Sequence, residues 1–196
     1  TLIITVVSVL IGFVLGIILA LMRLGHNKLL HGLAVAYIEF IRGTPLMVQV
    51  MFVYFGIGAV IQSLPALAAG IIAVSLNSGA YVAEVIRSGI ESIAIGQTEA
   101  ARSLGMSQKQ TYQYVVIPQA IKNIWPALGN EFITLIKESS IVSVIGVGDL
   151  MYQTQLVQSA TYKGVAPLAI TMVIYFVLTF TLSKGLNYFE GKMKHE

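Results

Sequence analysis

Long apolar runs alternate along the chain with short connectors that carry most of its polar residues. The runs fall at residues 1–22, 45–61, 66–90, 121–145 and 167–186, and the shortest holds 17 residues. Because a helix rises 1.5 Å per residue, about 17 to 25 residues cross the hydrocarbon core of a bilayer. The pattern therefore predicts an all-α integral membrane protein with five transmembrane helices, in which residues 1–196 form a single domain.

The composition supports the same class. Hydrophobic residues make up 56% of the chain and charged residues 11%, and the mean hydropathy is +0.81. This balance excludes an ordinary soluble domain, which has roughly half apolar and a quarter charged residues. The chain has no cysteine, which excludes disulfides and thiolate metal sites. Its pI is near 9.1, but the basic residues form no runs, so no nucleic-acid partner is expected.

The positions of the basic residues predict the orientation in the membrane. The first connector carries Arg23, His26, Lys28 and His31. The positive-inside rule places this connector in the cytoplasm, so the N-terminus lies outside and the C-terminus in the cytoplasm. On the five-helix interpretation, all but two of the 12 Lys and Arg residues lie at or near the cytoplasmic face; the exceptions are Lys137 and Lys163. We expect a multi-pass protein of the cytoplasmic (inner) membrane.

The first run, residues 1–22, is expected to be a membrane helix. A cleaved signal peptide would need a basic lead before a shorter apolar core, and neither is present. The run does not begin with Met, so the natural N-terminus is expected upstream. Gly12 and Gly16 form a GxxxG pair, which favours close contact with another helix, although two small residues can also occur at this spacing by chance.

The polar stretch 96–118, between the third and fourth runs, predicts two short helices that meet at a glycine. Gly105 can adopt the left-handed conformation that closes a helix. Ser107 precedes Gln110 by three residues, the spacing of a capping box, so a second helix can begin at once and continue to about Val116. Pro118 ends that helix or opens the next. We interpret this loop as a docking element for another protein.

Two polar stripes cross the apolar runs at membrane depth. At 100° per residue, Asn77, Tyr81 and Glu84 fall on one side of the third run. A second face on the fourth run holds Asn130, Glu131, Thr134, Lys137 and Glu138. Ionisable groups in a membrane are costly unless they are paired or hydrated, so both stripes are expected to face a shared cavity that forms a solute pathway or gate.

The polar groups in these stripes fit the two ends of a zwitterion. Lys137 and Asn77 are candidates for a carboxylate, and Glu84 or Glu138 for an ammonium group. Before the second run, Glu39 and Arg42 are three residues apart and are expected to form an ion pair. The structural alternative for the stripes is interhelical packing, and for Glu84 packing or gating is the favoured interpretation over substrate selectivity.

Four motifs now support a resemblance to a known family. Glu99-Ala100-Ala101, Gly105 and Val115-x-Ile117-Pro118 resemble the EAA loop of permease subunits of ATP-binding cassette (ABC) type I importers. In the family pattern, Ile and Leu stand where this chain has Val115 and Ile117. The sequences RGTP at 42–45, AYVAE at 80–84 and KESS at 137–140 resemble the polar amino-acid branch, which includes histidine, glutamine and arginine permeases. The resemblance covers about residues 1–186.

The resemblance implies that this chain forms the transport pathway while a separate ATPase subunit binds ATP and Mg²⁺. It implies docking to that subunit through the loop, with Glu99, Ala100, Ala101, Gly105, Ser107 and Pro118 as coupling residues. It also implies a second permease subunit, identical or homologous, and an extracytoplasmic amino-acid-binding protein, all within membrane lipid. This chain itself is expected to bind no cofactor and no metal.

Motifs that the sequence lacks agree with a transport subunit that is not an enzyme. There is no G-x-x-x-x-G-K-[ST] phosphate-binding loop, and the three histidines have no metal-ligand spacing. An ion-coupled secondary transporter or a channel subunit is the alternative, since both place polar residues in membrane helices. Neither has a use for the docking loop, and secondary transporters usually show internal repeats, of which none is evident.

Overall fold

The computed structural model describes residues 1–60 and 64–195, and in this part of the chain every regular element is helical. The predicted all-α class is therefore confirmed. The elements in chain order are α1 (Leu2–Leu24), α2 (Lys28–Arg42), α3 (Leu46–Met51), η1 (Phe52–Ile57), α4 (Gly58–Val60), α5 (Ala66–Glu91), α6 (Ile95–Ser103), α7 (Gln108–Thr111), η2 (Tyr112–Val116), α8 (Ile117–Glu138), η3 (Ser139–Ile145), α9 (Leu150–Thr161) and α10 (Val165–His195).

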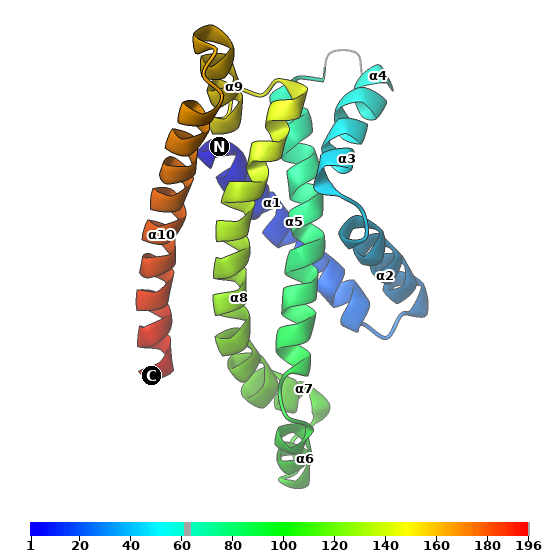
Figure 1. Cartoon of the computed structure of the whole chain (residues 1–196). Coiled ribbons are helices and arrows are strands. Elements are labelled where there is room, and N and C mark those ends of the chain that lie inside the picture. The colour runs from blue at the N-terminus through cyan, green and yellow to red at the C-terminus, as the bar shows by residue number, and fades with distance from the viewer. Residues whose placement is uncertain (61–63, 196) are drawn as a thin grey trace.

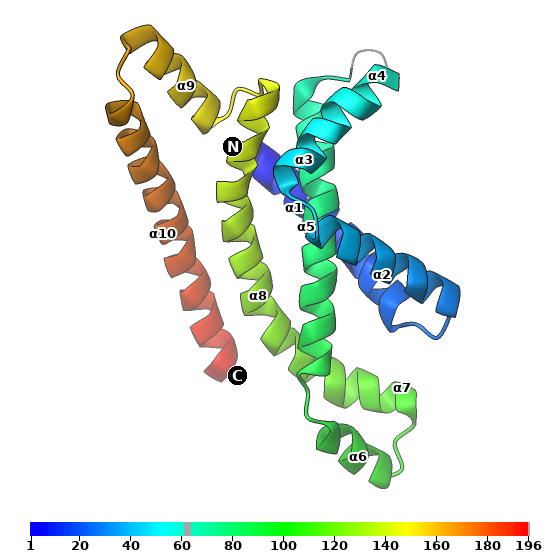
Figure 2. The same ribbon diagram turned by 45° about the vertical axis from the view of Figure 1, so that its right-hand side comes forward.

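Three described helices, α1, α5 and α10, are long and apolar enough to cross a membrane. A fourth crossing is formed if α2 and the segment 46–60 count as one span, and these two pieces are bent by 104°. The end of the second expected span, residue 61, lies outside the described residues. Helix α8 runs beside α5 in both views (Figures 1 and 2) but carries Lys122, Glu131, Lys137 and Glu138. Five membrane crossings therefore stay a prediction.

Helix α5 is the centre of the bundle. In its most apolar stretch 61% of the residues are buried, against 33% in α1 and 11% in α10. It contributes Ala73 and Val74 to one buried cluster and Ala83 to a second, which also contains Ile38 of α2. Figures 1 and 2 show α1 crossing α5 obliquely and α10 at the side of the bundle next to α8. Much of α10 thus exposes apolar side chains, as a lipid-facing helix does.

The crossing of α1 and α5 depends on glycines from both helices. A Cβ atom on Gly12 would lie 2.6 Å from Ser78 Oγ, and one on Gly16 would lie 2.5 Å from a methyl carbon of Val82. From the other side, a Cβ on Gly79 would lie 2.7 Å from Leu15. Atoms cannot approach so closely, so the two backbones touch only because these positions lack side chains. This geometry supports the helix-packing interpretation of the GxxxG pair.

The basic connector after α1 contains a helix of its own, and the fourth expected span does not end as a regular α-helix. The side chain of Asn27 caps α2 by accepting hydrogen bonds from the amides of Leu29 (3.0 Å) and Leu30 (3.3 Å). At the other end of the bundle, α8 stops at Glu138 and the chain tightens into the 3₁₀ segment η3. Gly146 closes it with φ of 80°, a left-handed conformation suited to glycine.

We predict that Gly16→Ala destabilises the fold by about 1–3 kcal/mol, the usual cost of overpacking. The added methyl group must displace Val82 or separate α1 from α5. The measurement is thermal unfolding of the purified chain in detergent. Gly32→Ala is the control, because Gly32 lies in helix α2 with no atom within 4 Å of its Cβ position. Equal unfolding temperatures for both variants would contradict the proposed close packing.

Candidate coupling loop and translocation pathway

The loop between α5 and α8 has the turn that its sequence predicts. Helix α6 ends at Ser103, and Gly105 follows with a φ of 84°; its amide donates to the carbonyl of Arg102 at 3.0 Å. Ser107 Oγ then accepts from the amide of Gln110 at 3.3 Å, while Gln110 Oε1 accepts from the amide of Ser107 at 2.8 Å. The predicted left-handed glycine and capping box are both confirmed.

The expected coupling residues differ in their exposure. Ala101 was expected to meet a partner surface, but it is only 4% exposed, because the loop folds its own residues over that side of α6. The other expected coupling residues remain exposed: Glu99, Ala100, Gly105, Ser107 and Pro118. Leu104 is 86% exposed, and the sequence analysis missed it. A large apolar residue immediately before a helix-closing glycine, in an otherwise polar loop, is the signal that could have identified it.

The loop is attached to two long helices. Only residues 92–94 separate α5 from α6, and Asn123 Nδ2 of α8 donates to Ser92 Oγ at 2.9 Å across this turn. Pro118 lies in the first turn of α8, which follows η2 without a break, so this proline opens the helix. Figures 1 and 2 show α6 and α7 at the end of the bundle opposite α9. A force on the loop would act directly on the ends of α5 and α8.

The part of the α5 stripe nearer the start of that helix, at Asn77, contacts the bend between α2 and α3. Asn77 is 3% exposed, and its Nδ2 donates to Gln49 Oε1 of α3 at 3.0 Å. Gln49 Nε2 in turn donates to the carbonyl of Ile41 at 2.7 Å and to Thr44 Oγ1 at 2.9 Å. Gln49 thus joins the end of α2 to α5. Sequence analysis missed this residue, because nothing local in the sequence shows which distant amide it meets.

The part of the stripe nearer the end of α5 forms an ion cluster around Glu84. Glu84 Oε2 lies 2.9 Å from Arg23 Nη1 of α1 and 3.6 Å from Arg42 Nη1 of α2, while Glu84 Oε1 lies 2.5 Å from Arg87 Nη2. Arg42 also lies over the ring of Tyr81, with 5.5 Å between Cζ and the ring centroid. Arg87 makes a further ion pair with Glu91 one turn below.

This cluster corrects the expected pair of Glu39 with Arg42. Within the described residues those two side chains form no ion pair, and Glu39 is exposed. Arg42 instead turns toward Glu84, where a partly buried carboxylate attracts it more strongly than an exposed one in water would. The helical spacing of Glu39 and Arg42 is compatible with an ion pair, but Arg42 contacts Glu84 of α5 instead.

The polar face of α8 is more open than the α5 stripe. Asn130, Lys137 and Glu138 are exposed, and Glu131 and Thr134 are half-buried. Helix α8 packs against α5, the helix that carries Glu84 of the ion cluster. Lys137 lines a pocket of about 370 Å³ together with Ser140 and Tyr175, and this pocket includes no residue of the α5 stripe.

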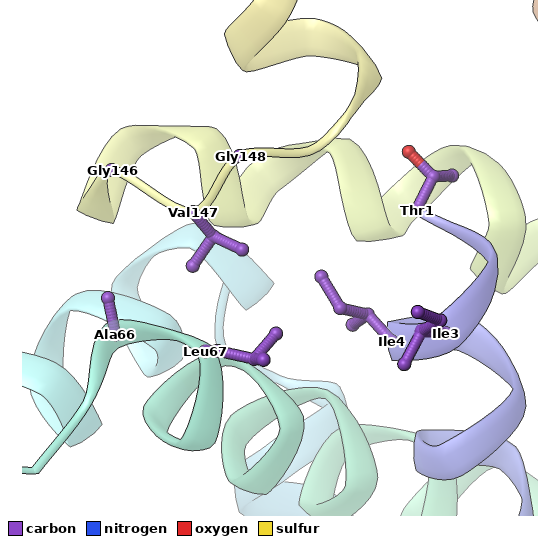
Figure 3. A pocket seen from close by; sticks show the side chains of 8 residues that line it. All are labelled: Thr1, Ile3, Ile4, Ala66, Leu67, Gly146, Val147 and Gly148. Carbon is purple, nitrogen blue, oxygen red and sulfur yellow. The ribbon is translucent and has the colours of Figure 1, made fainter.

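A second pocket of about 370 Å³ lies at the end of the bundle that holds α9. Figure 3 shows its lining residues, which come from the first residues of α1, the start of α5 and the glycine-rich segment after η3: Thr1, Ile3, Ile4, Ala66, Leu67, Gly146, Val147 and Gly148. None of these was an expected pathway residue. Among the residues that the structure describes, no group of three or more His, Asp or Glu side chains could hold a metal ion.

Comparison with known proteins gives the family. A family model described as "Binding-protein-dependent transport system inner membrane component" matches residues 12–195. The chain belongs to this family. The resemblance to ABC importer permeases is thereby confirmed, and this permease is a multi-pass membrane component of a transport system, with no finding that supports a secondary transporter or a channel.

Named relatives and solved structures are similar along nearly the whole permease. It is 41% identical over 194 residues to "Probable glutamine ABC transporter permease protein GlnM" of Bacillus subtilis, covering 99% of this chain and 90% of the relative. It is 44% identical over 195 residues to "Arginine transport system permease protein ArtQ" of the same organism, covering 99% and 89%.

The solved structures agree. The crystal structure of an amino acid ABC transporter with histidines matches with a TM-score of 0.92 and 51% identity, covering 96% of this chain and 88% of that one. The MetNI methionine ABC transporter in an inward-facing form matches with a TM-score of 0.78 at 21% identity, covering 97% and 91%, which supports the fold alone.

Proposed function

We propose that this chain is the permease subunit of an ABC importer that carries polar amino acids across the cytoplasmic membrane. The observation that supports this most is the exposed loop 96–118, which closes at Gly105 and presents Ala100 and Leu104 to the surroundings. Relatives at 41% and 44% identity are named as glutamine and arginine permeases, so a polar amino acid is the proposed substrate class.

The energy source in this proposal is another polypeptide. The chain has no phosphate-binding loop, so ATP and Mg²⁺ are assigned to an ATPase subunit whose surface receives the loop. A second permease subunit, identical or homologous, completes the pathway. An extracytoplasmic amino-acid-binding protein delivers the substrate at the end that carries α9.

The proposed pathway follows the open face of α8. Asn130, Lys137 and Glu138 are exposed in the single chain, where two facing permease subunits would enclose them. The α5 residues Asn77 and Glu84 have partners within the chain and are assigned to the gate, with Tyr81 beside them. Glu131 and Thr134 lie between these two groups along the same route. Lys137 is the proposed cation for the substrate carboxylate.

Docking is tested by Leu104→Asp, which places a charge on the exposed apolar contact. We expect the rate of ATP-driven substrate uptake to fall at least tenfold. We also expect less ATPase subunit to be recovered with the permease on purification. Val165→Asp is the control, because Val165 is also apolar and 81% exposed but is the first residue of α10, directly after α9, and α9 lies at the end of the bundle opposite the loop. Wild-type uptake by a correctly inserted Leu104→Asp chain would refute the assignment of the loop.

Orientation is tested by cysteine labelling, which the absence of native cysteines makes unambiguous. Cysteine in place of Ser107, on the loop, should react with an impermeant maleimide only from the cytoplasmic side. Cysteine in place of Ser159, on α9, should react only from outside. Both positions are exposed, so neither result depends on unfolding. Labelling of both from the same side would contradict the orientation based on the positive-inside rule.

The pathway is tested by equilibrium binding of a radiolabelled amino-acid panel to the reconstituted complex. Lys137→Met should weaken binding at least tenfold, because a hydrogen bond to a charged group contributes roughly 1.5–3 kcal/mol. Glu138→Gln should weaken binding of the substrate ammonium group to a similar extent. Lys163→Met, which removes an exposed cation in the connector before α10, should bind like wild type. Unchanged affinity in both α8 variants would assign this face to subunit packing instead.

A further inference from the structure

The bend between α2 and α3, residues 41–49, is joined to α5 at two heights by polar contacts. We call this segment the elbow. Gln49 meets Asn77 at the upper contact, and Arg42 meets Glu84 and Tyr81 at the lower one. Asn77 and Glu84 are seven residues apart, so two turns of one face of α5 hold the elbow.

The elbow is held differently from the neighbouring helices. Helix α1 meets α5 through glycines at backbone distance, a contact with no room for movement. A pocket of about 290 Å³ borders the elbow, lined by residues that include Thr44 and Val48 of the elbow, Phe52 of η1 and Ala73 of α5. The π-helix η1 follows α3 directly, and single π turns often mark functional positions in helices. The elbow therefore borders an open pocket, and its attachment to α5 combines the apolar packing of Leu46 with polar contacts that can open.

The lower contact is arranged so that its guanidinium groups compete. One carboxylate, Glu84, serves three guanidinium groups, and Arg42 is the most distant of them at 3.6 Å, against 2.9 Å for Arg23 and 2.5 Å for Arg87. Attraction between charges falls with distance, so Arg42 is the first of the three to be released when Glu84 shifts toward the others. Arg23 stays with α5 because the glycine crossing holds α1 in place.

The position of this contact along α5 connects it to the coupling loop. Glu84 and Arg87 lie in the last two turns of α5, and Arg87 is paired with Glu91 at the final residue of the helix. Only residues 92–94 separate Glu91 from the start of α6. A displacement of the loop must therefore rotate or shift the part of α5 that carries Glu84, while the elbow is attached only through side chains.

We propose that the elbow is a moving part of the transport cycle, and that Asn77 and Glu84 are positioning residues that hold it against α5 until the coupling loop shifts α5 and releases it. The proposal rests on the proposed function, because only a docked ATPase would move the loop. Beyond docking, the proposal names the elbow as the segment of the permease that responds when the loop moves.

The direct test locks the elbow. Cysteines in place of Gln49 and Asn77 are joined by a short, reducible bifunctional thiol reagent in the reconstituted complex, and ATP-driven uptake is measured before joining, after joining and after reduction. We expect joining to reduce uptake at least tenfold and reduction to restore it. Comparing one protein in its two states removes the effect of the substitutions themselves.

The matched control locks a contact that should not move. Ser8 Oγ of α1 and Ser75 Oγ of α5 both donate to the carbonyl of Ile71, at 3.3 Å and 2.6 Å, so cysteines at these two positions lie across the glycine crossing. Joining this pair should leave uptake unchanged. If the locked elbow transports as well as its reduced form, the proposal is overturned. If the wild-type complex shows no ATP-driven uptake at all, the proposed function fails instead.

The competition for Glu84 gives a second readout, the number of ATP molecules hydrolysed per substrate transported. This ratio should rise in the order Arg42→Lys, Arg42→Gln, Glu84→Gln, and by at least threefold in the last. Removing the carboxylate of Glu84 leaves three guanidinium groups that repel one another. Removing Arg42 leaves the other two guanidinium groups still paired with Glu84. A purely structural role would lower the unfolding temperature of the complex without changing the ratio, and that result would refute the proposal. If Glu84→Gln does not assemble, the two Arg42 variants and the locked elbow decide.

Discussion

Polar side chains at membrane depth need partners, and this requirement determines how the helices around α5 are arranged. A carboxylate or an amide in hydrocarbon is costly when it is unpaired. Glu84 meets three guanidinium groups, and Asn77 meets the amide of Gln49. Arg87 belongs to α5 itself, whereas Arg23, Arg42 and Gln49 come from α1, α2 and α3, so the polar stripe of one helix contacts three others. Arg42 and Gln49 lie on the two sides of the 104° bend between α2 and the segment after it, so the contacts hold both arms of the bend.

Local features of the sequence predicted local features of the fold well. The turn at Gly105 and the cap formed by Ser107 and Gln110 depend on residues at most three positions apart, so their chemistry is visible in the sequence. Burial in a loop is different. Ala101 faces inward and Leu104 outward because of how α6 packs on the residues after it, and the spacing of the motif contains no information about that packing.

For contacts between helices, the sequence predicted which helix faces are polar but not which residues meet. The periodicity of Asn77 and Glu84 indicated that α5 presents a polar face, but it could not show that the partners would be Gln49 and Arg42. The pair expected between Glu39 and Arg42 failed for this reason, since a partly buried carboxylate on another helix outcompetes an exposed neighbour one turn away. The open face of α8 is the opposite case, because Asn130, Lys137 and Glu138 stay exposed in the single chain.

Two kinds of helix contact thus coexist on α5, and their physics differs. The glycine crossing with α1 is short-ranged, because dispersion and steric repulsion between backbones allow one arrangement and no gradual opening. The contacts with the elbow are hydrogen bonds and ion pairs, whose donors can exchange acceptors at little net cost when water or another carboxylate is near. A helix with one rigid and one exchangeable side can transmit a displacement to the exchangeable side while the rigid side keeps the bundle together.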